Sequence, residues 1–141
     1  MQIVFNLSGV FTASSSTLEN AITLRALLEA LIQTDLASLR NHAAPKLYAS
    51  RVVYGRTSEW ERIPDVIRRG YGDCKSLSAW LIAEYRMQGI AAKPKFRWKR
   101  RDSFGTGVPD YHILVQTSKG LECPSRRLGM NLDESSYFRT G

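Results

Sequence analysis

The spacing of apolar residues predicts a long helix in the first third of the chain. The apolar side chains that recur at helical spacing are Leu24, Leu27, Leu28, Leu31 and Ile32. Ser16 and Glu19 precede them as an S-x-x-E capping box, which is typical of a helix start. The pattern predicts a helix over residues 18–40. A short strand is predicted to precede it over residues 2–7, where Ile3, Phe5 and Leu7 alternate with polar or smaller residues.

A second, more buried helix is predicted in the middle of the chain. Residues 75–88 contain no glycine or proline, and their apolar side chains occur on most sides of a helix. Gly89 follows as a favourable C-terminal cap. Between the two helices, residues 41–71 are predicted to be irregular, with a short helical turn from Pro64 to Arg69.

The last third of the chain changes to a period of two, which indicates strands. Residues 91–99 alternate between apolar and cationic side chains, residues 111–117 form a second apolar run, and residues 121–123 form a short third one that ends at Pro124. Helices followed by an antiparallel sheet give an α+β fold. We expect a single domain over residues 1–141, with an N-terminal strand and helix (1–44), a core (45–130) and a tail (131–141).

The chain is basic, with a formal net charge of +7, and this charge has two interpretations. It fits either a solvated basic surface or an anionic partner. The densest basic segment, KPKFRWKRR at residues 93–101, has six cations and could bind nucleic acid or an anionic cell-wall polymer. Strand alternation places Phe96 and Trp98 opposite the cations of the strand, so we expect these two rings to face the core.

Two cysteines and one strand histidine are the residues with candidate chemistry. Cys74 follows Gly70, Gly72 and Asp73 at the predicted start of the buried helix, where free N–H groups favour a thiolate, and Asp73 is suited to capping that helix. His112 lies on the predicted strand 111–117 and could act as the base for a thiol. A Cys74–Cys123 disulfide or a zinc site would use the same residues, but the cysteines are expected to lie too far apart and the paired C-x-x-C spacing is missing.

Together these residues carry a resemblance to a known family. The stretch GYGDCKSLSAWLIAEYRMQGIAA, followed by Tyr111–His112–Ile113–Leu114–Val115 and by Leu121–Glu122–Cys123–Pro124–Ser125, resembles the transglutaminase-like branch of the papain-fold cysteine proteases. The resemblance covers residues 47–130, and residues 45–69 are similar to small members encoded by bacteriophages. It implies a papain-like core, with the nucleophile helix packed on a short antiparallel sheet.

The resemblance implies a catalytic triad with an unusual third member. Cys74 matches the thiol nucleophile and His112 the general base, whereas Cys123 stands where the family usually carries aspartate. A carboxylate there would orient the imidazole and stabilise its cation, and a thiol is a weak hydrogen-bond acceptor. Glu122 and Asp110 are the carboxylates that could substitute, although alternation aims Glu122 away from Cys123; a Cys123 thiolate, a backbone carbonyl or a water could also hold the histidine.

The oxyanion donors are less clear from the sequence. The backbone N–H of Cys74 is a natural donor because a helix start presents free N–H groups. Trp60 could supply a second donor through its indole, but an anchoring role in the irregular segment is the simpler interpretation. No cofactor or metal is expected.

The sequence therefore predicts an enzyme that hydrolyses or transfers amides of a peptide or protein through a Cys74 acyl-enzyme. The alternative is a catalytically degenerate module of the same fold, used for protein interaction in phage assembly or host takeover. No signal peptide or membrane-spanning run is apparent, so we expect a cytoplasmic protein, in a host cell or associated with a virion.

Overall fold

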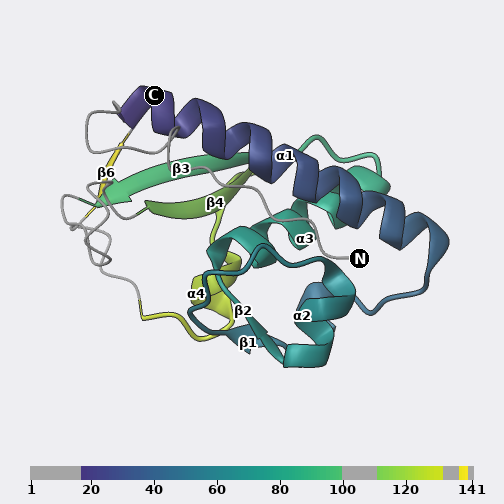
Figure 1. The fold of residues 1–141 in the computed structure, drawn as a ribbon. Helices are drawn as coiled ribbons and strands as arrows, with labels where there is room; N and C mark the ends of the chain where they lie inside the picture. The colour runs from purple at the N-terminus through teal and green to yellow at the C-terminus, as the bar shows by residue number, and fades with distance from the viewer. Residues whose placement is uncertain (1–16, 100–110, 132–136, 140–141) are drawn as a thin grey trace.

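The computed structural model describes residues 17–99, 111–131 and 137–139 (Figure 1). Its elements are α1 (Thr17–Asn41), the 3-10 helix η1 (Leu47–Ala49), β1 (Val53–Tyr54), α2 (Ile63–Arg69), β2 (Tyr71–Gly72), α3 (Cys74–Met87), β3 (Lys93–Lys99), β4 (Tyr111–Thr117), β5 (Gly120–Glu122), α4 (Pro124–Arg127) and β6 (Tyr137–Arg139). The predicted α+β class is confirmed. The strand expected over residues 2–7 and the capping residue Ser16 lie outside the described residues.

The larger sheet has the strand order β5-β4-β3-β6, and every neighbouring pair is antiparallel. Directly paired residues share one face of a sheet, so the pairs of Lys93 with Gln116 and Arg97 with His112 lie on the same face. The C-terminal segment was expected to be a tail, but residues 137–139 form β6 and pair with Arg97 to Lys99 of β3. Pro124 likewise does more than end a strand, since it begins α4.

The core lies between the helices and the opposite face of this sheet. Phe96, Trp98, Ile113 and Val115 come from that face and are fully buried. They belong to one apolar cluster with α1 and α3, and Figure 1 shows α1 running along the sheet while α3 occupies the middle of the molecule. The expectation that both aromatic rings of β3 face the core is therefore confirmed. None of the described helices is long and apolar enough to cross a membrane.

Candidate active site

The short strand β2, which contains Gly72, leads directly into the start of α3. Gly70 ends α2 with φ of 86°, a left-handed conformation that favours glycine, and its N–H bonds the carbonyl of Val66 at 2.8 Å. Gly72 serves a different purpose, because a Cβ there would lie only 3.2 Å from Val66 Cγ1. The two glycines thus allow a reversal after α2 and a close approach of the chain to α3.

Asp73 caps α3 as predicted, and Cys74 is the first residue of the helix. The Asp73 carboxylate accepts hydrogen bonds from the backbone N–H groups of Lys75 at 3.2 Å and Ser76 at 3.4 Å. Ser78 fixes the same end of the helix to the sheet by donating its hydroxyl proton to the carbonyl of Ile113 at 3.1 Å. The thiol of Cys74 is therefore held on a well-anchored helix end beside β4.

Lys75 is a residue of this site that sequence reasoning missed. Its side chain is buried and forms an ion pair with Asp73, and its ammonium also donates to the carbonyl of Thr57 at 3.1 Å. The ring of Trp60 lies 5.7 Å from the same ammonium. A lysine in the first turn of a helix predicted to be buried was the available signal. The contact agrees with an anchoring role for Trp60, the simpler of its two interpretations, because Lys75 ties the irregular segment to α3.

The environment of Cys74 differs from the expected one. Burial raises the pKa of its thiol to about 12, the Asp73 carboxylate raises that pKa further, and Lys75 and a hydrogen bond from the Ile113 backbone oppose them. The side chain is only 9% exposed. The expectation that the helix start would favour a thiolate is wrong for this arrangement, because the loss of water around a buried sulfur outweighs the helix dipole. Cys74 is a neutral thiol at pH 7.

His112 and Cys123 are in direct contact. The imidazole Nε2 lies 3.1 Å from the sulfur of Cys123, and the ring is almost completely buried on β4. Cys123 is the N-cap of α4 and also accepts from the backbone N–H of Arg126 at 3.4 Å. The structure thus brings the predicted base and the predicted third residue together, and both cysteines are free thiols.

The two carboxylates considered as substitutes for the missing aspartate do not gain support. Glu122 accepts a hydrogen bond from Tyr48 with one oxygen and from Tyr85 with the other, the latter at 2.6 Å. Its partner on β4 is Val115, whose side chain faces the core, so alternation turns Glu122 away from Cys123. Glu122 therefore links Tyr48 and Tyr85 within the fold, and the expectation that it could support His112 is wrong. Asp110 lies outside the described residues.

Cys74 and Cys123 both approach the first half of β4, the strand that carries His112. The thiol of Cys74 is bonded by the backbone of Ile113, the residue after His112, and Cys123 is close enough to raise the pKa of that thiol. Tyr111, the residue before His112, is another member that sequence reasoning did not assign. Burial raises the pKa of its phenol strongly, and Cys74 and Asp73 raise it further, so the hydroxyl remains a proton donor at neutral pH.

On its outer side Cys123 borders an open, basic hollow of about 390 Å³. Its walls include Arg97 from β3 and Arg126 and Arg127 from α4, together with Leu114 and Glu122. Cys123 is half-buried, whereas Cys74 is buried. The two thiols therefore differ in access to solvent and in the charge of their surroundings.

This difference predicts the order in which the thiols react with an alkylating reagent. At pH 7, without substrate, iodoacetamide should modify Cys123 before Cys74, because Cys123 is more accessible and contacts His112, while Cys74 is buried and protonated. Peptide mass spectrometry of a limited reaction would measure both sites, and Cys74→Ser would assign the slower one. Faster labelling of Cys74 would contradict the structure.

Comparison with known proteins finds no matching family model, curated protein or solved structure.

Proposed function

We propose that this protein is a transglutaminase-like cysteine enzyme that hydrolyses or transfers amides through a Cys74 acyl-enzyme. The observation that carries the proposal is the contact of His112 Nε2 with the sulfur of Cys123 at 3.1 Å. His112 lies on β4, and the backbone of the next residue, Ile113, bonds the thiol of Cys74 at the start of α3. A nucleophile on a helix start, a base on a strand and a third residue behind the base are the parts that thiol acyl transfer needs.

The reaction starts with a proton transfer, since the resting thiol is neutral. Cys74 gives its proton to His112 as its sulfur attacks the substrate carbonyl, and the C–N bond of the amide breaks as the imidazolium returns that proton to the leaving amine. The resulting thioester is released by water or by an amine, which loses a proton to His112. Because Nε2 is turned to Cys123, the buried Nδ1 is the ring nitrogen that exchanges the proton.

Two donors are available for the oxygen of the tetrahedral intermediate. The backbone N–H of Cys74 lies at the first residue of α3, where N–H groups have no partner within the helix. The phenol of Tyr111 stays protonated and lies near Cys74. Removing one such donor costs about 10²–10³ in rate in acyl-transfer enzymes.

The proposal is tested by trapping the acyl group. With p-nitrophenyl acetate, the protein should show a burst of p-nitrophenolate equal to the enzyme concentration, and peptide mass spectrometry should find the acetyl group on Cys74. Cys74→Ala should abolish the burst. His112→Asn should slow it by about 10²–10⁴-fold, the usual contribution of a general base.

The other histidine provides a matched control. His42 follows α1 and is exposed, so His42→Asn should leave the burst unchanged. A burst that survives Cys74→Ala, with acetyl on Cys123 and none on Cys74, would overturn the assignment of the nucleophile, whereas acetyl on Cys123 in addition to Cys74 reflects only its accessibility. If neither cysteine carries acetyl, the chain is a non-catalytic module of this fold, an alternative favoured by the protonated state of Cys74 and the thiol at position 123.

A further inference from the structure

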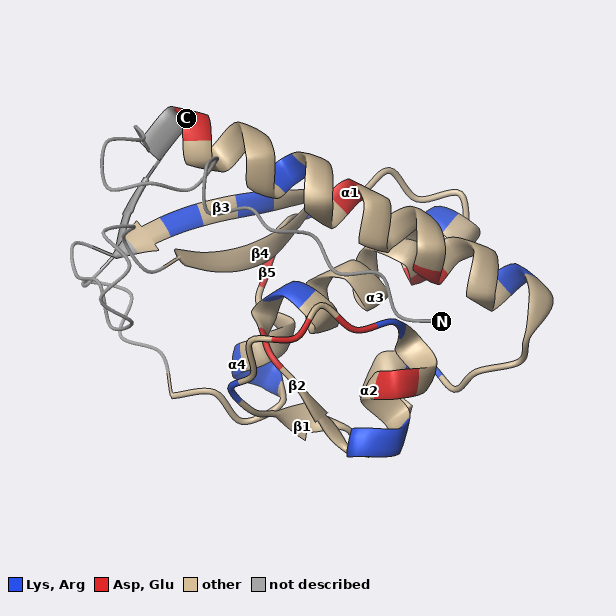
Figure 2. Ribbon diagram, in the orientation of Figure 1, with Lys and Arg blue, Asp and Glu red and all other residues tan. Residues whose placement is uncertain are grey.

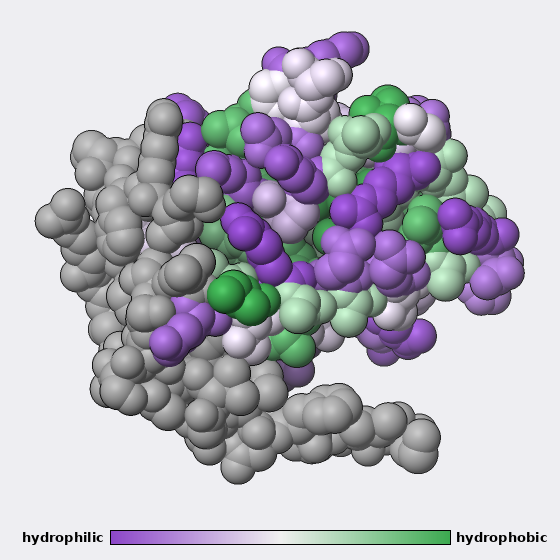
Figure 3. All heavy atoms as spheres, turned by 90° about the horizontal axis from the view of Figure 1, so that it is seen from above, coloured by the Kyte–Doolittle hydropathy of each residue, from purple (hydrophilic) through white to green (hydrophobic). Residues whose placement is uncertain are grey.

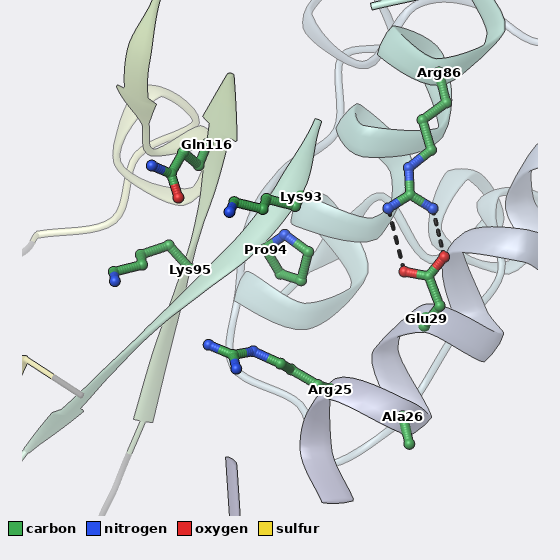
Figure 4. Close-up of a pocket in the computed structure, with 8 residues that line it drawn as sticks. All are labelled: Arg25, Ala26, Glu29, Arg86, Lys93, Pro94, Lys95 and Gln116. Carbon is green, nitrogen blue, oxygen red and sulfur yellow. Dashed lines mark hydrogen bonds and ion pairs between the residues drawn. The ribbon is translucent and has the colours of Figure 1, made fainter. Parts of the chain in front are cut away.

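A second hollow, away from the cysteines, opens at the edge of the larger sheet between α1 and β3. It has a volume of about 650 Å³, and six of its residues bear on what it can bind: Arg25, Glu29, Arg86, Lys93, Lys95 and Gln116. Figure 4 shows the side chains of Arg25, Lys93, Lys95 and Gln116 on one side of Pro94 and the pair of Arg86 and Glu29 on the other. Residues from α1, α3, β3 and β4 thus form one polar site.

The charges of this hollow are not balanced. Glu29, the one carboxylate among its lining residues, is bound by both terminal nitrogens of Arg86, at 2.5 and 3.2 Å, and this contact lowers the pKa of Glu29. Within the described part of the chain, no carboxylate forms an ion pair with Arg25, Lys93 or Lys95. Three cations therefore surround the opening while the acidic wall residue is already neutralised.

A contact of Arg25 and the pairing of β3 shape the opening. The guanidinium of Arg25 lies 5.6 Å from the ring centre of Phe96, so a cation–π contact orients it toward β3. β6 covers β3 only from Arg97 to Lys99, which leaves the edge at Lys93 to Lys95 unpaired in the described residues. Pro94 has no N–H to donate at this edge, so addition of another strand is disfavoured and charge is the basis of recognition.

The cations continue along the strand at a regular interval. Lys93, Lys95 and Arg97 share one face of β3 and follow one another about every 7 Å, since two strand residues span that length. This interval is close to the separation of successive phosphates in an extended sugar-phosphate chain. Figure 2 shows blue bands, which mark Lys and Arg, along β3. In the coloured part of Figure 3, hydrophilic residues are interspersed with hydrophobic ones.

The aromatic residues of the same strand take no part in this surface. Phe96 and Trp98 are 0% exposed, so neither ring can stack on a base. A nucleic acid bound here would be held through its phosphates alone, and its base sequence would matter little.

We propose that Arg25, Lys93 and Lys95, with Gln116 as a neutral donor, bind the phosphodiester backbone of a single-stranded nucleic acid without sequence preference. This site is independent of the proposed acyl chemistry. The basic segment 93–101 left open whether an anionic partner binds there. The proposal places such a partner at residues 93–95 of β3 together with Arg25 of α1, a residue that the sequence did not assign.

Fluorescence anisotropy with labelled 15-nucleotide single strands tests the proposal. Oligo-dT and a mixed sequence should bind the full chain with affinities within about twofold of each other, and the affinity should fall linearly with salt on a logarithmic scale. The double variant Arg25→Ala/Lys95→Ala should reduce the salt slope by about 1.4, because each contact with a single-strand phosphate contributes about 0.7. Thermal unfolding of the variant would establish that it is folded.

A second double variant that removes the same number of positive charges distinguishes a localised binding site from non-specific attraction between the nucleic acid and a basic protein. The double variant Arg40→Ala/Lys46→Ala also removes two positive charges, from residues that are both exposed. Arg40 is fifteen residues from Arg25 on α1, about 22 Å along the helix. The salt slope of this variant should therefore remain that of the wild type. The proposal is overturned if both double variants lose the same slope or neither loses any. It is also overturned if a duplex binds more tightly than the single strand, or if heparin, a sulfated polymer, binds as tightly with the same dependence on Arg25 and Lys95.

Discussion

Cys123→Asp is expected to raise the rate at which Cys74 is acylated, by up to about 10⁴-fold. The sulfur of Cys123 lies 3.1 Å from His112 Nε2, so an aspartate oxygen can take its place as the acceptor of that nitrogen. A carboxylate holds the imidazole tautomer and stabilises its cation, and exchanging such a carboxylate for a neutral group costs about 10⁴ in a serine-protease triad. The burst of p-nitrophenolate measures the rate.

The surroundings of position 123 favour this substitution. Arg97, Arg126 and Arg127 line the adjacent hollow and would stabilise a carboxylate there. The same position is the N-cap of α4, where aspartate is a stronger acceptor than cysteine for the N–H of Arg126. The variant should therefore be no less stable than the wild type in urea.

Two further variants separate charge from shape. Cys123→Asn should give a smaller gain than Cys123→Asp, because an amide can accept a hydrogen bond but carries no charge. Cys123→Ala should be slower than the wild type, since it leaves Nε2 without the contact. A Cys123→Asp protein no faster than the wild type would show that His112 does not work through position 123.

Asp35→Asn is expected to stabilise the protein at alkaline pH and to have little effect near pH 4. Asp35 is fully buried in α1 and accepts from the N–H of Ile63 at 3.0 Å, and burial raises its pKa to about 7 although that hydrogen bond and Arg62 oppose the shift. The unfolded carboxyl titrates near 4. The folded protein therefore binds an extra proton between pH 4 and pH 7, so its stability falls as the pH rises through that window.

Asparagine removes the charge and keeps the acceptor for Ile63. The three-unit difference in pKa corresponds to about 4 kcal/mol in the free energy of unfolding, so the variant should exceed the wild type by up to that amount at pH 8.5. Urea denaturation at both pH values measures the difference. Asp65→Asn is the control: Asp65 pairs with Arg62 and Arg68 near the surface of α2, and its loss should change stability by less than about 1 kcal/mol at either pH. If the free energy of unfolding changed with pH in the same way for the wild type and for Asp35→Asn, the expected cost of burying the Asp35 charge would be contradicted.

Much of the secondary structure could be predicted because it depends on local periodicity. The helix expected over residues 18–40 is α1, the strand over 111–117 is β4 with the same bounds, and the Asp73 cap lies where a polar residue precedes an apolar helix. The strand β6 could not be predicted, because three residues at the end of the chain carry no period and pair only when β3 offers them an edge.

The candidate site divides in the same way. The residues themselves, the start of α3 at Cys74, and the opposite orientation of Glu122 follow from the sequence, since helix starts and strand alternation are local properties. Tertiary structure decided the rest. Packing against β4 buries Cys74 and keeps its thiol protonated, and the turn into α4 brings Cys123 to His112. The contact of α1 with β3 places Arg25 beside Lys93 and Lys95, which lie on a strand distant in sequence. Periodicity specifies which way a side chain points along its own element, whereas desolvation and contact depend on which other element covers it.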